Sequence, residues 1–221
     1  MDTAFYSTLL IPALNRGLVM SLKLIIPSVL IGLGLGIVIG TLRTFGHPVI
    51  RKAANGYAAI FRGTPLLVQL FLLYFGLPTL GIYLDAYTAA VAGFILCSSA
   101  YHSEYIRGGL LSIKKGQLLA AQSMGFSTFK TMFTIILPQA LRRALPGCGN
   151  EIIYLIKYSS LAYIITCIEL TGEGKIIATR TFRYTEVFLV IGLYYLVLVT
   201  MASFLLKKIE EKFKIPGFGK A

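Results

Sequence analysis

The chain has 221 residues, of which 56% are hydrophobic and 14% charged, with a formal net charge of +12. Soluble domains are about 45–50% apolar and about 25% charged. The composition, with a mean hydropathy of +0.76, therefore excludes a soluble enzyme, a disordered chain and a disulfide-stapled secreted module. Cys97, Cys148 and Cys167 lie in apolar stretches without metal-ligand spacing, which is typical of small buried residues.

Five apolar segments are long enough to be considered as membrane spans, because a transmembrane helix needs about 20 mostly apolar residues. The fourth is the least apolar, since it contains Lys157 and begins beside Glu151. The sequence thus predicts an all-α, polytopic membrane protein with one transmembrane domain over residues 1–221. The predicted spans are residues 18–42, 63–82, 86–103, 152–168 and 187–206.

The basic residues between these spans predict the orientation, because short cytoplasmic loops carry an excess of Lys and Arg. Fifteen lie in residues 43–62, in residues 104–151 and in the C-terminal tail, which includes Lys214 and Lys220. Only four lie on the other side, where three of them share a loop with acidic residues. We therefore expect the N-terminus outside and the C-terminus in the cytoplasm, and we interpret the charges as topology signals rather than a nucleic-acid surface.

The segment 104–151 is too long for a plain connection. Residues 117–124 read as a short helix that Gly125 stops, and Ser127 is a good N-cap for a second helix over residues 128–137, which Pro138 is expected to end. Such a helical pair suits insertion into a groove of another protein. The pattern alone does not separate this from a helix that lies on the bilayer surface.

At this point the chain resembles the permeases of ABC importers. Residues 119–125 and 136–146 together resemble their cytoplasmic signature. That signature begins with Glu-Ala-Ala, followed by three variable residues and a Gly. About nine residues later it continues with Ile-x-Leu-Pro. Three further motifs resemble the branch that handles polar amino acids of the histidine, glutamine and arginine type. They are Phe61-Arg62-Gly63-Thr64-Pro65-Leu66-Leu67-Val68-Gln69, Ala100-Tyr101-His102-Ser103-Glu104-Tyr105-Ile106-Arg107-Gly108-Gly109 and Lys157-Tyr158-Ser159-Ser160-Leu161.

The resemblance implies a five-span permease of the type I importer architecture in a bacterial inner membrane. It would pair with a second copy or a close paralogue, receive solute from an extracytoplasmic binding protein, and dock two ATPase subunits on residues 117–138. The coupling residues would be Leu119, Ala120, Ala121, Gly125 and Pro138. The chain has no G-x-x-x-x-G-K-[ST] pattern, so we expect it to bind no cofactor, to be no enzyme itself, and to leave ATP and Mg²⁺ to the partner ATPase.

Two positions depart from the family pattern. Leu119 stands where the cytoplasmic signature usually opens with Glu, which affects one contact with the ATPase rather than docking as a whole. Tyr158 stands where the fourth span usually has Asp. That second change bears on the substrate, because it leaves Glu151 as the one carboxylate on this face of the span.

An ionisable group within a span is a functional candidate, because an unpaired charge in hydrocarbon is costly. Glu151 and Tyr158 lie seven residues apart and so point to nearly the same helix face. Glu151 can hold the ammonium of a free amino acid, and one carboxylate balances one ammonium. We therefore predict an amino acid without a net positive side chain, or recognition by a paralogous subunit.

Polar contacts along the pathway are expected from Tyr158 and from Thr64, Gln69 and Ser159. Glu151 has an alternative role, a structural ion pair with Lys157, Arg142 or Arg143. Tyr158 has one too, that of an aromatic residue at the membrane interface.

The remaining features read as structural. Arg62, Gly63 and Pro65 favour a turn at the start of the second span. Gly32, Gly36 and Gly40 form a stripe for close helix packing. His47 and His102 lack partners at metal-ligand spacing, and we assign neither to a site.

Two other functions remain open from the sequence. A secondary transporter driven by an ion gradient would usually show inverted repeats, charges at the midplane and more spans. A membrane scaffold that docks a cytoplasmic partner through residues 117–143 would need no pathway. The sequence names neither the amino acid nor the choice between homodimer and heterodimer.

Overall fold

The structure, a computed structural model, describes residues 3–213, so Lys214 and Lys220 lie outside the described residues. Every regular element in that range is helical, in agreement with the predicted all-α class. The α-helices are α1 (Ile11–Phe45), α2 (Pro48–Gly63), α3 (Leu66–Phe71), α4 (Ala86–Leu111), α5 (Lys115–Ser123), α6 (Thr128–Thr131), α7 (Leu137–Tyr158), α8 (Leu170–Thr181) and α9 (Tyr184–Phe213). Shorter 3-10 and π-helical turns are η1 (Phe5–Leu10), η2 (Leu72–Gly76), η3 (Leu77–Leu80), η4 (Met132–Ile136) and η5 (Ser159–Ile165).

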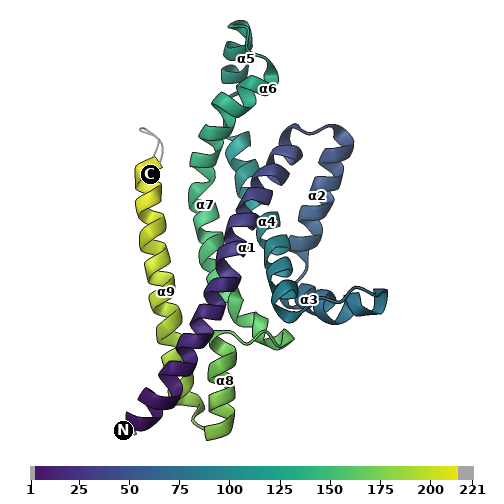
Figure 1. Ribbon diagram of the computed structural model, residues 1–221. Coiled ribbons are helices and arrows are strands. Elements are labelled where there is room, and N and C mark those ends of the chain that lie inside the picture. The colour runs from purple at the N-terminus through teal and green to yellow at the C-terminus, as the bar shows by residue number, and fades with distance from the viewer. Residues whose placement is uncertain (1–2, 214–221) are drawn as a thin grey trace.

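Helix α4 lies at the centre of the bundle, where it packs against α1, α2, α3 and α7 (Figure 1). Its tightest neighbour is α1, whose glycine stripe faces it. A Cβ on Gly36 would overlap the Cβ of His102, and a Cβ on Gly40 would lie 2.9 Å from the Ser103 carbonyl oxygen. Because only glycine lets the two backbones approach this closely, the predicted packing role of the stripe is confirmed.

Two of the described helical stretches, Phe5–Phe45 and Tyr184–Phe213, are long and apolar enough to cross a membrane. The number rises to four if each of two bent helix pairs counts as one span. Helix α4 does not reach this hydropathy, because its buried face carries hydroxyl and imidazole groups from Ser98, Ser99 and His102. The five-span topology therefore stays a prediction.

The predicted second span, residues 63–82, is not one straight helix. The chain bends by 103° between the stretches Pro48–Gly63 and Leu66–Leu80. Pro65 disfavours the helical conformation at the residue before it, and Thr64 is extended, with φ −113° and ψ 141°. The turn predicted for this motif is present, and the helix that follows it continues as α3, η2 and η3.

The expectation that Pro138 ends a helix is wrong. Pro138 lies in the first turn of α7, which runs on to Tyr158 and continues as η5. The missing N–H of a proline is tolerated in a first helical turn, and the π-helical turn η4 directly before it shifts the hydrogen-bond register. The helix of the predicted fourth span, residues 152–168, therefore begins already at Leu137, inside the segment predicted as a cytoplasmic connection.

Candidate functional site

The α5–α6 hairpin extends beyond the ends of the other helices at one end of the bundle (Figure 1). Gly125 follows α5 with φ +84°, a conformation that favours glycine. The Ser127 hydroxyl then accepts a hydrogen bond of 3.3 Å from the Lys130 amide, as predicted for an N-cap. Gln117 and Gln139 donate to each other's side-chain carbonyls, at 3.2 and 2.8 Å, and so fasten the hairpin to α7.

The surface of this hairpin is unusually apolar for an exposed segment. Leu119, Met124 and Phe129 are 62%, 70% and 72% exposed. The predicted coupling residues Ala120, Gly125 and Pro138 are exposed as well, and a Cβ on Gly125 would meet nothing within 4 Å. Ala121 differs from them, because it is 1% exposed and packs inside the hairpin. An exposed cluster of this kind is typical of a surface that a partner covers.

Thr64 and Gln69, both predicted to line a pathway, are engaged with the backbone at the α2–α3 bend. The amide nitrogen of Gln69 donates to the carbonyl oxygens of Phe61 and Thr64, at 2.9 and 3.0 Å, and to the Thr64 hydroxyl at 2.9 Å. That hydroxyl donates in turn to the Ile60 carbonyl at 2.8 Å. Gln69 thus satisfies the Phe61 and Thr64 carbonyls at the end of α2, whereas the Ile60 carbonyl also accepts from the Thr64 amide at 3.1 Å.

Glu151 lies buried in the middle of α7, at 3% exposure. Within residues 3–213 it makes no ion pair and no hydrogen bond, so the proposed structural pair with Lys157, Arg142 or Arg143 is absent there. The ammonium of Lys157 instead lies over the Tyr154 ring, 4.3 Å from its centroid. A buried carboxylate without a partner is costly, and it is the chemical feature that a cationic ligand group would satisfy.

Two predicted neighbours of Glu151 lie about two turns further along the chain, Tyr158 at the end of α7 and Ser159 at the start of η5. Tyr158 is 37% exposed and stacks on Tyr154, with ring centroids 5.9 Å apart. Ser159 is buried and donates to the Ile156 carbonyl at 2.8 Å. Tyr158 therefore offers a free hydroxyl to a ligand, whereas the Ser159 proton is already used by the backbone.

Helix α4 contacts both α7, which carries Glu151, and the helices α2 and α3 on either side of the bend. Its Tyr101 ring has the Arg62 guanidinium over it, 5.6 Å from the centroid. Among the described residues, no hydrogen bond or ion pair joins Glu151, Tyr158 or Ser159 to Thr64 or Gln69.

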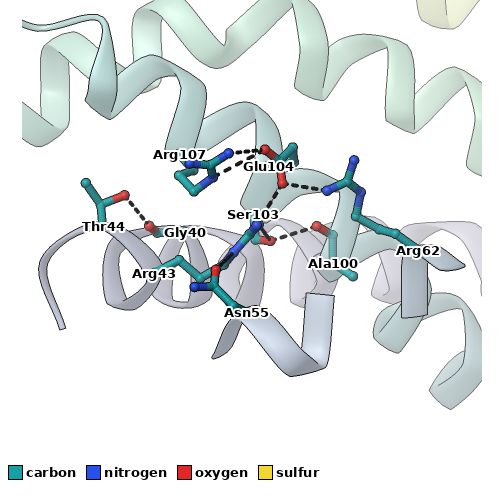
Figure 2. Close-up of polar contacts among 9 residues, drawn as sticks. All are labelled: Gly40, Arg43, Thr44, Asn55, Arg62, Ala100, Ser103, Glu104 and Arg107. Atoms are coloured by element: carbon teal, nitrogen blue, oxygen red, sulfur yellow. Dashed lines mark hydrogen bonds and ion pairs between the residues drawn. The ribbon is translucent and has the colours of Figure 1, made fainter. Parts of the chain in front are cut away.

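A cluster around Glu104 was missed by the sequence reasoning, which treated its arginines as topology signals. The Glu104 carboxylate pairs with Arg43 of α1 at 2.8 Å, with Arg107 of α4 at 2.7 Å and with Arg62 of α2 (Figure 2). Arg43 also donates to Ser103 and Asn55, both at 2.9 Å. One carboxylate therefore ties three helices together. The available signal was the i,i+3 spacing of Glu104 and Arg107.

A bundle of apolar helices, a buried carboxylate that is unpaired among the described residues, and an exposed helical hairpin at one end are together typical of a membrane permease. Residues 7–215 match the family described as "Binding-protein-dependent transport system inner membrane component". The chain belongs to that family, and it is a permease component of an ABC transport system. The resemblance drawn from the sequence motifs is confirmed.

The relatives agree over nearly the whole chain. The glutamine transport system permease protein of Escherichia coli (strain K12) is 38% identical over 207 residues, which cover 93% of this chain and 94% of the relative. The arginine transport system permease protein of Bacillus subtilis (strain 168) is 38% identical over 205 residues, or 92% and 94%.

Solved structures show the same fold. A chain from the crystal structure of an amino acid ABC transporter with histidines is 38% identical, with a TM-score of 0.83 over 91% of this chain and 94% of that one. A chain of an inward-facing methionine ABC transporter has a TM-score of 0.80 at 18% identity, over 97% and 100%, and supports the fold alone.

Proposed function

We propose that this chain forms the translocation pathway of an ATP-driven importer for a polar amino acid. It acts as a dimer with a second copy or a paralogue, and an extracytoplasmic binding protein delivers the solute. Two cytoplasmic ATPase subunits dock on the α5–α6 hairpin and supply ATP and Mg²⁺, which this chain does not bind. The observation that carries the proposal is this hairpin, which lies beyond the bundle with Leu119, Met124 and Phe129 exposed.

The orientation we propose has five spans, with the N-terminus outside and the C-terminus in the cytoplasm. The hairpin lies at the same end of the bundle toward which the C-terminal end of α9 points, while the N-terminus and α8 lie at the opposite end (Figure 1). The hairpin end carries most of the basic residues, as expected for a cytoplasmic face. This arrangement supports docking of an ATPase at that end.

The substrate group that we assign first is the ammonium. Glu151 is buried and unpaired within the described residues, so a ligand ammonium would supply its missing counter-charge. Tyr158 contributes a hydroxyl about two turns away, and Ser159, Thr64 and Gln69 shape the wall of the pathway through their backbone contacts. A single carboxylate on this face balances a single ammonium. We therefore propose a substrate without a net positive side chain.

The test uses the permease reconstituted into vesicles together with an ABC ATPase and an extracytoplasmic amino-acid-binding protein from the same organism. Uptake of labelled glutamine should require ATP and should persist when a protonophore collapses the proton gradient. Uptake that survives ATP depletion but stops with the protonophore would show a secondary transporter. Tight docking of the ATPase without any solute uptake would show a scaffold.

A further inference from the structure

A cleft of about 780 Å³ lies between the end of α4, the first half of α7 and the end of α9. Its charged wall includes Arg142 on α7 and Lys207, Glu210 and Glu211 on α9. Leu145 and Pro146 give it an apolar side. Glu151 is not among the residues that line the cleft, and none of the functions discussed above uses it.

The charges in this cleft are available to a ligand. Within residues 3–213, Arg142, Lys207, Glu210 and Glu211 form no ion pair and no hydrogen bond with one another or with other side chains. Glu104, which reaches the same cleft, is already bound to three arginines. Arg143 also lines the cleft and donates to the carbonyl and hydroxyl oxygens of Ser112, at 2.6 and 2.9 Å. Besides these engaged groups, the cleft presents two cationic groups, Arg142 and Lys207, and two anionic groups, Glu210 and Glu211. It is therefore complementary to a molecule that carries both charges.

The position of the cleft on α9 indicates the source of that molecule. Lys207 follows directly on the twenty-residue apolar run 187–206, so it lies where an apolar span ends and lipid headgroups begin. The preceding turns of α9 expose Val197, Met201 and Phe204, each more than half. The cleft is therefore bordered by exposed apolar side chains of α9 and by charged side chains at the membrane boundary, so a lipid molecule can enter it.

We propose that this cleft binds the headgroup of a zwitterionic phospholipid that carries a primary ammonium, that is, a phosphoethanolamine headgroup. Arg142 and Lys207 bind the phosphate, and Glu210 and Glu211 accept hydrogen bonds from the ammonium. Leu145 and Pro146 contact the glycerol and the upper acyl chain. The bound lipid bridges α7 and α9 near their cytoplasmic ends. The proposal rests on membrane insertion of the chain and not on the transported substrate.

The size of the cleft and the chemistry of its acids favour this occupant. Pockets of roughly 300–1,000 Å³ hold drug-sized molecules, and a free amino acid of about ten non-hydrogen atoms would leave most of this volume to water. A choline headgroup has the same charge but no N–H to donate to the two carboxylates. A glycerol headgroup has the phosphate but no cation. Both should therefore bind more weakly than phosphoethanolamine.

The test measures lipid retention on the full-length chain by native mass spectrometry in detergent. Phosphatidylethanolamine, phosphatidylcholine and phosphatidylglycerol with the same acyl chains are offered at equal concentration. We expect about tenfold more phosphatidylethanolamine to be retained than either of the other lipids. A difference of this size corresponds to about one charge-assisted hydrogen bond between the ammonium and the carboxylates. The double variant E210Q/E211Q should lose this preference, and R142Q/K207Q should lower retention of all three lipids.

Lys212 provides the matched control, because it lies exposed on the same end of α9 but does not line the cleft. K212Q should leave the preference unchanged. Equal retention of the three lipids by the native chain would overturn the proposal, as would a preference that survives in E210Q/E211Q or displacement of the lipid by free glutamine. Circular dichroism checks that each variant keeps its helical fold. If E210Q/E211Q does not fold, the single variant E211Q, at an exposed position, takes its place in the test.

Discussion

Arg43 on α1 and Glu104 on α4 form an ion pair of 2.8 Å, and the Arg43 side chain is only 7% exposed. The two residues are separated by sixty-one positions in the sequence. Because Glu104 also binds Arg62 and Arg107, its single negative charge holds three guanidinium groups in one place. Removal of that charge leaves three cations in mutual repulsion.

Glu104→Gln should therefore lower the free energy of unfolding by about 2–4 kcal/mol. The variant loses hydrogen bonds, and it also leaves the buried Arg43 guanidinium without a counter-charge, which costs more than the lost hydrogen bonds. Thermal unfolding in detergent measures the change. Glu186→Gln is the matched control, because Glu186 pairs with Arg183 at 3.8 Å with both side chains well exposed. That control should cost less than about 1 kcal/mol. Equal losses in the two variants would contradict the role of the cluster.

Gly36→Leu should destabilise the chain by about 1–3 kcal/mol or more, because its side chain would overlap His102 in the α1–α4 interface. Gly34→Leu is the control on the same helix, since a Cβ there meets nothing within 4 Å. We expect Gly34→Leu to unfold at the same temperature as the native chain. If both variants behave alike in detergent, close packing of the glycine stripe does not contribute to stability.

Gly125→Trp should uncouple ATP hydrolysis from solute uptake while the protein still inserts, because a bulky side chain would project from the hairpin that we assign to ATPase docking. Gly125→Ala imposes backbone strain of roughly 1–2 kcal/mol at φ +84° without the bulk. This control variant therefore separates the effect of backbone strain from that of a bulky side chain, and it should retain most of the solute uptake. The measurement is ATP hydrolysis and uptake in the same vesicles. Normal transport by Gly125→Trp would show that the docking assignment is wrong.

The proposed topology places Thr179 outside the cell and Lys114 and Lys212 inside. All three side chains are exposed, and the native cysteines are buried, so the background of cysteine labelling is low. A membrane-impermeant thiol reagent applied to intact cells should modify a cysteine at position 179 and miss one at position 114 or 212. Labelling at position 114 from outside would contradict the five-span arrangement.

Tyr158→Asp should shift selectivity toward amino acids with a cationic side chain, because it adds a second carboxylate on the face of Glu151. Tyr158 is 37% exposed, so solvent screens part of the added charge, and the shift should stay below the value of about 3–5 kcal/mol for a fully buried pair. Competition for ATP-driven uptake in vesicles measures it, and Tyr158→Phe is the control that removes the hydroxyl without adding charge. Arginine or lysine as the best competitor of the native transporter, in a homodimer of this chain alone, would contradict the proposed substrate class.

The sequence by itself determined the features that depend on neighbouring residues. Apolar runs set the helical membrane class, the Gly125 and Ser127 pair set the break between α5 and α6, and Pro65 set the bend after α2. These features follow from hydropathy, capping and backbone sterics, which act over a few residues. The glycine stripe also belongs here, because its four-residue period points to one helix face.

Only the tertiary structure decided which distant groups meet. Glu104 forms ion pairs with arginines from three helices. Gln69 donates to backbone carbonyls of α2 and of the bend, although the sequence suggested that Gln69 lines a pathway. Ala121 turns inward among exposed neighbours, and α7 runs through Pro138 because a π-helical turn precedes it. In a folded chain, a charged or amide side chain could form hydrogen bonds or ion pairs with many different groups that are distant in the sequence. The packing of helices around α4, rather than any local pattern, selects among them.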